Sequence, residues 1–295
     1  MLMQEIEDFL SYLIADRGYS AETVETYRLS LTKFLDFFTR LDSQLTWYSL
    51  DGDIIRQWMA EEMQNGNSAR YVAKHLSALR SFYRYLLRMD RVRKDPVRLV
   101  KNPKIHTPLP TFLKQQEVDR LFDDVEFPDN FIGLRDRTIL LTFYHTGLRL
   151  SELIGLDLSS ADLSARELKV TGKRNKQRII PFGTELHQEL LLYRRVRLEQ
   201  PTDDTALFIS HKGKRMTKAQ VQTMVKHYLS FVTTQKKKSP HVLRHTFATA
   251  MLNNGAELEA IKELLGHASV VTTEVYTHTT FADLKKEYEH AHPRA

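Results

Sequence analysis

Apolar residues recur every three or four positions along most of the chain, the spacing of helices that bury one face. Before residue 90 this pattern predicts four helices: about 4–16, one that begins after a Ser20 cap, 53–64 and 67–89. Tyr19 and Val24 are spaced to form a hydrophobic staple across the Ser20 cap. We therefore expect residues 1–89 to form a small all-helical domain.

Helical spacing also dominates the second part of the chain. It predicts further helices at about 115–125, 131–145, 186–200, 218–231, 241–253 and 257–265. Alternating residues at 167–170 and 178–181 predict a β-hairpin around the turn 171–177, and 206–210 is a further short strand. The expected fold class is mainly α, with a small β-hairpin or sheet in a C-terminal domain at 111–295.

The composition narrows the class of protein. The 295 residues are 42% hydrophobic and 27% charged, which is typical of a globular chain rather than a disordered one. Cysteine is absent, which excludes disulfides, thiol catalysis and Cys-ligated zinc and favours a reducing cytoplasm. The acidic start (MLMQEIEDFL) is not typical of a secretory leader, and the apolar stretch 138–148 is too short to span a bilayer. We expect a soluble intracellular protein.

Charge is concentrated in one block of the chain. The net charge is +6, yet residues 1–64 hold 5 Lys+Arg against 12 Asp+Glu, and residues 65–104 hold 11 against 2. The second half of this block has prolines at 96, 103, 108 and 110, which stop helices and favour extended chain. Residues 90–110 are therefore expected to be a basic interdomain linker.

The first half of the basic block is the predicted helix 67–89. At about 100° per residue, its face opposite the apolar side carries Arg70, Lys74, Ser77, Ser81, Arg84 and Arg88. Such a row can simply be a solvated helix face. It contains no acidic residue, however, and aligned cations repel unless an anion lies along them. We therefore expect this stripe to contact phosphate groups of a polyanion.

Four segments carry candidate chemistry: TGLRLSEL at 146–153, the hairpin turn TGKRNKQ at 171–177, SPHVLRHTFAT at 239–249 and GHASVVTTEVYTH at 266–278. In the third, Ser239 is a good helix cap and Pro240 suits the first helical position. His241 and Arg244 then share a face near the helix N-terminus, where unpaired N–H groups favour an anion. An anion site is therefore expected there.

Each segment also has an ordinary structural interpretation. Arg149 can pair with Glu152, and Tyr276 is one of 12 tyrosines. His241 and His245 have the i, i+4 spacing of zinc ligands, but no HExxH glutamate or cysteine supports a metal site. The TGK of the hairpin is not a phosphate-binding P-loop, because Glu occupies position 167 where that loop needs glycine.

Together these segments form a set that resembles the tyrosine recombinase, or phage integrase, family, most closely its Xer subgroup. The resemblance rests on TGLRLSEL, TGKRNKQR, HVLRHTFATAMLNNGA, ELLGHASVVTTEVYTH and the terminal HPRA, and it spans nearly the whole chain. Departures are small: Arg174 stands where the family often has glycine, and Ala250 where histidine is common. The catalytic residues that it implies are Arg149, Lys173, His241, Arg244, His267 and Tyr276.

The resemblance also implies a reaction. The Tyr276 phenol attacks a DNA phosphodiester and forms a 3′-phosphotyrosyl enzyme with a free 5′-hydroxyl. Two arginines and His267 donate to the phosphate oxygens, His241 accepts the phenol proton, and Lys173 protonates the leaving oxygen. Because the covalent bond conserves the phosphoester, the resemblance implies no metal, ATP or other cofactor.

At the level of architecture, the resemblance implies a C-shaped two-domain clamp around double-stranded DNA. A SAM-like core-binding domain (1–89) and the catalytic domain (111–295) are joined by the linker (90–110). Residues 280–295 form an amphipathic helix and tail that can cap its own core. The resemblance instead implies donation to a neighbouring protomer in a four-subunit synapse.

The biological role expected from the Xer resemblance is resolution of chromosome dimers at cell division. The resemblance also implies a related partner recombinase and activation by a DNA translocase, on the nucleoid and not at a membrane. A mobile-element integrase with the same chemistry is the nearest alternative, and the lack of an additional N-terminal arm-binding domain argues against it. A topoisomerase of type IB and a DNA-binding protein that cleaves nothing are more distant alternatives.

Overall fold

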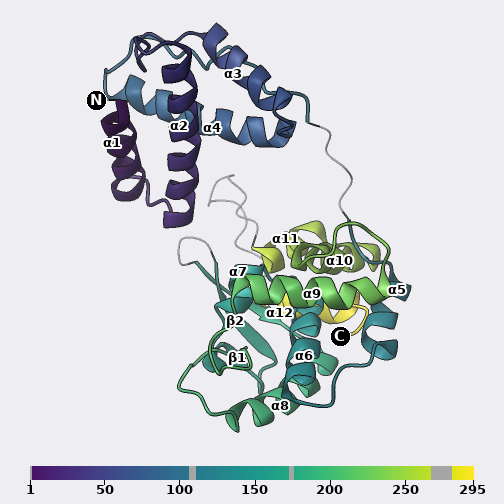
Figure 1. Cartoon of the computed structure of the whole chain (residues 1–295). Coiled ribbons are helices and arrows are strands. Elements are labelled where there is room, and N and C mark those ends of the chain that lie inside the picture. The colour runs from purple at the N-terminus through teal and green to yellow at the C-terminus, as the bar shows by residue number, and fades with distance from the viewer. Residues whose placement is uncertain (1, 106–110, 173–175, 267–280) are drawn as a thin grey trace. The chain divides into compact units, whose positions relative to one another are not determined.

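The computed structural model describes residues 2–105, 111–172, 176–266 and 281–295 (Figure 1). The chain divides into two compact units, Met1–Pro108 and Leu109–Ala295, each with its own hydrophobic core. Within the described ranges, no helix is both long and apolar enough to cross a membrane.

Four helices make up most of the N-terminal unit, and they confirm the four predicted from the sequence: α1 (Leu2–Ala15), α2 (Ala21–Leu41), α3 (Gly52–Gln64) and α4 (Ala69–Arg88). Ser20 caps α2 by accepting a hydrogen bond from the Thr23 N–H, as predicted. The apolar face of α4 is fully buried, from Val72 to Leu86. Its other face is consequently left at the surface.

The chain that follows α4 packs on the N-terminal unit for much of the predicted linker. Val97 and Val100 lie in the N-terminal core. The Arg80 guanidinium of α4 donates to the Val100 carbonyl at 2.7 Å and to the Asn102 side chain at 2.8 Å. Arg91 forms ion pairs with Glu5 and Asp8. Part of the basic block therefore serves to fix the end of this unit.

The C-terminal unit has helices around a small sheet (Figure 1). Its helices are α5 (Gln115–Asp119), α6 (Phe131–Thr146), α7 (Leu150–Ile154), α8 (Thr184–Leu198), α9 (Lys218–Val232), α10 (Pro240–Asn253), α11 (Leu258–Leu265) and α12 (Phe281–Ala291), with a π-helical turn η1 (Arg120–Asp124) and a 3-10 turn η2 (Leu158–Ser160). The predicted helix 115–125 is thus split. Its second half is the π-helical turn, which the Val125 N–H closes by bonding to the carbonyl of Arg120.

The sheet is antiparallel and contains β1 (Ala161–Asp162), β2 (Glu167–Thr171) and β3 (Gln177–Pro181) in that order. Thr171 pairs with Gln177 at the turn end of β2 and β3, which confirms the predicted hairpin. The residues at the tip of the turn, 173–175, lie outside the described part of the chain.

The strand predicted at 206–210 is wrong. This segment forms only two isolated bridges, Asp157 with Ala206 and Ile209 with Arg215. Side chains take the carbonyls that a neighbouring strand would use: Arg197 donates to Ala206, Tyr193 to Leu207 and Arg135 to Ile209. The segment therefore satisfies its buried polar groups without a ladder, so its apolar pattern alone was misleading.

The C-terminal segment packs on its own chain, as its amphipathic pattern allows. Tyr288 is fully buried, and its hydroxyl lies 3.1 Å from Nδ1 of His145 on α6. The His292 ring stacks on the His145 ring with 4.5 Å between centroids. Arg294 pairs with Glu185, which also contacts His145 Nε2. We call Tyr288, His292 and Arg294 the C-terminal latch.

We expect mild acid to loosen the C-terminal latch. Burial lowers the pKa of His145 and His292 below their ordinary value of 6.5, so the folded protein excludes protons that the unfolded chain takes up. Stability is then full above about pH 6.5 and falls as the pH drops, by about 1.4 kcal/mol per pH unit for each histidine. Melting temperatures between pH 7.5 and 5.5 should show this loss.

His292→Phe removes one titrating ring but keeps an aromatic ring at the same place, so its melting temperature should depend less on pH. His211→Phe is the control, because His211 is exposed. Equal pH dependence in wild type and His292→Phe would contradict the assignment.

Candidate active site

Arg149 is placed by the end of the buried helix α6. That helix ends at Gly147, which has a left-handed φ of 59°. A Cβ at Gly147 would lie 2.5 Å from the Phe247 ring and 2.7 Å from the Leu265 side chain, so only glycine fits this turn. Arg149 follows in extended conformation as the N-cap of α7, a short helix that the sequence pattern did not predict.

Arg244 reaches the same place from α10. The helix begins with Ser239 at the cap and Pro240 at the first helical position, as predicted. The Ser239 hydroxyl makes no capping bond, however, and is buried without a partner among the described residues. Arg244 is buried one turn further on and donates to the carbonyl of Gly147 at 2.5 Å.

Both arginines converge on the C-terminal end of α11, which packs against α10 (Figure 1). Arg244 donates to the carbonyl of Leu265 at 2.8 Å, and Arg149 donates to the carbonyl of Gly266 at 3.0 Å. The last carbonyls of a helix have no intrahelical partner and carry the negative end of its dipole. The end of α11 therefore holds two guanidiniums side by side.

A buried carboxylate, Glu152, balances part of this charge. One of its oxygens accepts from the Arg149 side chain at 2.9 Å, and the other accepts from the Arg149 backbone N–H at 2.8 Å. Arg178 from β3 also pairs with it. Burial alone would raise the pKa of Glu152, but the bonds from Arg178 and Arg149 lower it below its usual range. The ion pair between Arg149 and Glu152 that the sequence suggested is thus present.

In the described part of the site, Glu152 is the one carboxylate among Arg149, Arg178 and Arg244, so this part is positive. Burial and the neighbouring Arg149 charge lower the pKa of Arg244 to about 10. Arg244 is still protonated at neutral pH, but its buried position next to Arg149 makes its positive charge unfavourable. Arg149 keeps about a third of its side chain exposed. A phosphate bound here would relieve the repulsion between the guanidiniums.

His241 lies on the first turn of α10 and is exposed. Burial of part of its ring, together with the charges of Lys237, Arg244 and Arg149, lowers its pKa below 6.5. The ring is therefore neutral at pH 7 and can accept a proton. Lys237 was not singled out from the sequence, although it stands in a run of three lysines just before the helix.

Three predicted site residues, Lys173, His267 and Tyr276, lie outside the described part of the chain. The described residues beside them are informative nevertheless. The Gly172 N–H bonds to the Lys176 carbonyl at 2.8 Å at the base of the hairpin turn. Gly266, which contacts Arg149, directly precedes His267. Glu152 and Arg178 were missed as site residues. The sequence signal for Glu152 was its three-residue spacing from Arg149, and Arg178 stood out only as one of several cations of the hairpin.

The predicted DNA-contacting stripe lies on the outer face of α4. Its members are exposed, apart from half-buried Ser81: Arg70, Lys74, Ser77, Ser81, Arg84 and Arg88. Arg88 stacks on the Tyr12 ring and donates to its hydroxyl at 2.9 Å. Among the described residues, Arg70 and Lys74 have no acidic partner.

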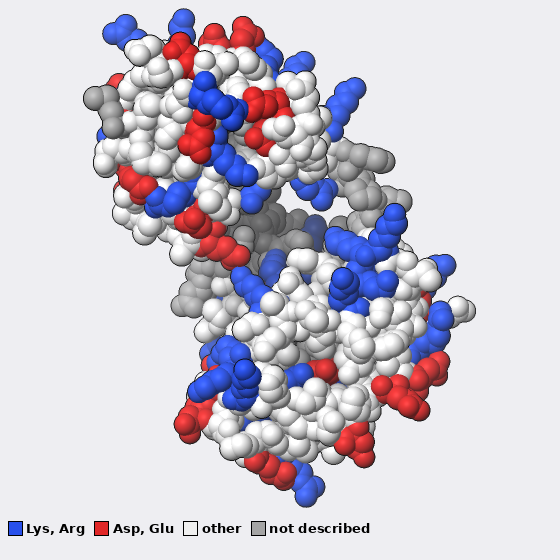
Figure 2. Space-filling model, viewed as in Figure 1, with Lys and Arg blue, Asp and Glu red and all other residues white. Residues whose placement is uncertain are grey.

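Several other cations of the same unit are paired with acids. On the face shown in Figure 2, Lys and Arg side chains of the N-terminal unit alternate with Asp and Glu. Arg28 pairs with Glu7 in this unit, and Arg40 pairs with Glu61. The stripe on α4 therefore differs from these paired cations, because it contains no acid.

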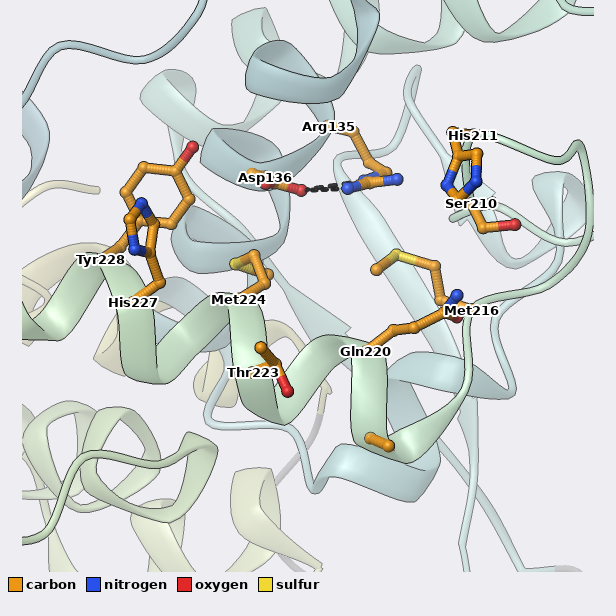
Figure 3. A pocket seen from close by; sticks show the side chains of 11 residues that line it. Arg135, Asp136, Ser210, His211, Met216, Gln220, Thr223, Met224, His227 and Tyr228 are labelled. Carbon is orange, nitrogen blue, oxygen red and sulfur yellow. Dashed lines mark hydrogen bonds and ion pairs between the residues drawn. The ribbon is translucent and has the colours of Figure 1, made fainter.

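A separate pocket of about 560 Å³ lies in the C-terminal unit beside α9 (Figure 3). Met224 and His227 of α9 point toward the buried ion pair of Arg135 with Asp136, which forms the opposite wall, and Thr223 also lines the pocket. None of the described catalytic candidates lines this pocket. The arginine site at the end of α11 is thus distinct from it.

Comparison with known proteins agrees with the geometry. The Phage integrase family profile matches residues 111–283, and the profile of the phage integrase N-terminal SAM-like domain matches residues 6–90. Tyrosine recombinase XerC of Chlorobaculum tepidum is 38% identical over 315 residues, covering 98% of this chain and 94% of that protein. Tyrosine recombinase XerC of Pseudomonas aeruginosa is 39% identical, with 99% of this chain and 95% of that protein covered.

Solved structures show the same fold. The XerH site-specific recombinase bound to palindromic difH substrate, in its post-cleavage complex, has a TM-score of 0.71 at 21% identity, covering 94% of this chain and 78% of that one. A lambda integrase dimer bound to a core site has a TM-score of 0.70 at 15% identity, covering 91% and 95%. With family profiles over both units and close full-length relatives, the chain belongs to the phage integrase family of site-specific tyrosine recombinases, in its Xer subgroup.

Proposed function

We propose that this recombinase cuts and rejoins DNA through a 3′-phosphotyrosine bond to Tyr276 and that it resolves chromosome dimers. The observation that carries the chemical part is the convergence of Arg149 and Arg244 at the end of α11. They come from different elements, and one carboxylate of the described residues, Glu152, lies beside them. An excess of fixed guanidiniums is suited to a phosphodiester whose charge spreads over its oxygens during attack.

Each proposed catalytic residue has a distinct role. Arg149 and Arg244 donate to the two non-bridging phosphate oxygens, and His267 adds a further donor. His241 is neutral at pH 7 and accepts the Tyr276 proton, because a phenol with an ordinary pKa of about 10 is a weak nucleophile while protonated. Lys173, which follows β2 in the sequence, protonates the leaving 5′-oxygen. A phosphotyrosyl bond resembles the bond it replaces, so the proposed reaction is reversible and consumes no ATP.

The chromosomal role rests on the relatives. Those at 38–39% identity over nearly the whole chain are named tyrosine recombinase XerC. We propose that this chain acts with a related recombinase in a tetramer on a chromosomal site, where a DNA translocase activates it. It then works in the compartment of the chromosome, on the nucleoid. On DNA, residues 280–295 are proposed to exchange between protomers, which requires the C-terminal latch to open and close on a neighbour.

We further propose that the stripe on α4 grips the DNA backbone while the catalytic unit grips the opposite side of the duplex. Replacing both Arg70 and Lys74 by alanine should weaken DNA binding and flatten its salt dependence. Each lost phosphate contact lowers the slope of log K against log salt concentration by about 0.9, so the pair should lower it by roughly 2. The slope is measured by fluorescence anisotropy with a labelled duplex at salt concentrations from about 50 to about 300 mM, a range over which such binding usually changes strongly.

Arg40→Ala is the matched control, because Arg40 is a cation of the same unit that is paired with Glu61. Its slope should equal that of the wild type. If wild-type binding has no salt dependence, or if Arg40→Ala lowers the slope as much as the stripe variant does, the proposed grip is wrong.

The proposed reaction is tested by trapping the covalent complex. A nicked duplex that carries a candidate recombination site loses a short fragment on cleavage, which prevents religation. Wild-type protein incubated with it in EDTA should give a shifted, protease-sensitive band on a denaturing gel. No band from protein that still binds the duplex, with and without the partner recombinase, would favour a DNA-binding protein that does not cleave.

A further inference from the structure

A third guanidinium, that of Arg178, lies at the same end of α11 as the two proposed catalytic arginines. Arg178 is the second residue of β3, five residues after Lys173, and its side chain is 16% exposed. It donates to both oxygens of Glu152, at 2.9 and 3.0 Å. Its Nε also donates to the carbonyl of Leu264 at 2.9 Å. All these partners come from other elements.

The three arginines form an ordered series along the end of α11. The successive carbonyls of Leu264, Leu265 and Gly266 each accept from a different arginine: Arg178, Arg244 and Arg149 in turn. Of the three arginines, Arg178 makes the bidentate ion pair with Glu152, because its guanidinium donates to both carboxylate oxygens. Arg149 depends on the same carboxylate for its own orientation.

The backbone around Arg178 is shaped to admit its guanidinium. A Cβ at Gly266 would lie 2.8 Å from Nη1 of Arg178 and 3.0 Å from its Cζ. A Cβ at Gly172 would lie 3.4 Å from the Glu152 carboxylate and 3.7 Å from Arg178 Nη1. Gly172 and Gly266 immediately precede Lys173 and His267. The ion pair thus packs against both chain segments that lead to proposed catalytic residues.

We propose that Arg178 is a positioning residue for strand cleavage. It holds Glu152 in the orientation that aims Arg149, and it ties β3 to the end of α11, so that the hairpin and the arginine pair keep a fixed relation. It does not touch the phosphate. This inference deepens the proposed function and rests on it.

The test compares Arg178→Ala and Arg178→Lys with Arg215→Ala. Arg215 is a matched control: it pairs with Asp157, donates to the carbonyls of Ile154 and Leu156, and belongs to the same unit. Three quantities are measured on the nicked duplex used for trapping: the Kd, the single-turnover cleavage rate at saturating protein, and the melting temperature of each variant.

Arg178→Ala should lower the cleavage rate roughly 100-fold, as a misplacement of about 1 Å does, while the Kd changes less than about 3-fold. Arg178→Lys keeps the charge but not the bidentate fork, so it should recover about 10-fold of this loss. Arg215→Ala should cleave at nearly the wild-type rate even if it melts as early as Arg178→Ala.

The pH profile gives a readout that a purely structural role would not change. Among the described residues, the charged groups that act on Glu152 are Arg178 and Arg149, which bond to it, and Arg244, whose charge is coupled to it. Without Arg178, the burial that raises the pKa of Glu152 is opposed only by the bonds from Arg149, so we expect this pKa to rise and protonation of Glu152 to weaken its hold on Arg149. The cleavage rate of Arg178→Ala should therefore rise with pH between 5.5 and 8 more steeply than that of the wild type.

The possible outcomes distinguish the role of Arg178 from the proposed function of the protein. A wild type that cleaves, with Arg178→Ala cleaving equally well or losing only as much rate as Arg215→Ala, overturns the role of Arg178 alone. A loss that follows the Kd, or an unchanged pH profile, also overturns it. A wild type that binds DNA but forms no covalent complex overturns the proposed function, and the role of Arg178 with it.

Discussion

Tyr276→Phe should abolish covalent complex formation while leaving DNA binding intact. The substitution removes one oxygen atom, the proposed nucleophile, and keeps the ring. Loss of a nucleophile in an otherwise intact site lowers the reaction rate on the order of 10⁴-fold or more. The remaining groups are arranged to stabilise a transition state that cannot form without the nucleophile. On the denaturing gel the shifted band should disappear, and on a native gel the protein–DNA complex should remain.

Tyr228→Phe is the comparison for this experiment. It also removes a phenol oxygen from the C-terminal unit, but its residue lines the pocket of Figure 3 rather than the arginine site. It should cleave like the wild type. A Tyr276→Phe protein that still forms the covalent band would place the nucleophile on another residue and would contradict the proposed mechanism.

Replacement of the two proposed catalytic arginines by lysine should cause the second-largest loss. Lysine keeps the positive charge at Arg149 or Arg244 but cannot present two parallel N–H donors. Arg244 also spans the carbonyls of Gly147 and Leu265, which a single ammonium group cannot reproduce. We expect the single-turnover cleavage rate of each variant to fall about 10²- to 10³-fold, the usual cost of losing one donor to a developing oxyanion.

The affinity of these variants for uncleaved DNA should change much less, because the charge that attracts the phosphate remains. A melting curve is needed as a control for Arg244→Lys, since leaving one buried carbonyl without a donor costs about 1–3 kcal/mol. If the cleavage rate falls only in proportion to DNA affinity, the arginines bind the duplex without stabilising the transition state.

Most of the secondary structure follows from the sequence. The apolar spacing located the four helices of the N-terminal unit, since Val72 to Leu86 on α4 bury one continuous face. It also located the β2–β3 hairpin. Periodicity failed at 206–210, where side chains of Arg197, Tyr193 and Arg135 replace the partner strand. Those donors come from distant positions, and no local pattern records them.

The chemistry of the candidate site was only partly visible in the sequence. Arg149, His241 and Arg244 were identified from short motifs in order along the chain, and the structure brings Arg149 and Arg244 to the same helix end. The roles of Lys173, His267 and Tyr276 stay predictions from the family resemblance. Glu152 was considered only as an ordinary partner of Arg149, and Arg178 only as one of several hairpin cations.

By itself, the sequence determined most of the helical elements, the basic stripe on α4 and the family's motif residues, because each depends on spacing within one segment. Only the tertiary structure decided which groups share the end of α11. The bonds from Arg178 to Glu152, Arg178 to Leu264 and Arg149 to Gly266 join residues 26, 86 and 117 positions apart. Such contacts depend on how α7, β3 and α11 pack around a common core. That packing buries Glu152, and burial strengthens its electrostatic interactions with the three neighbouring arginines.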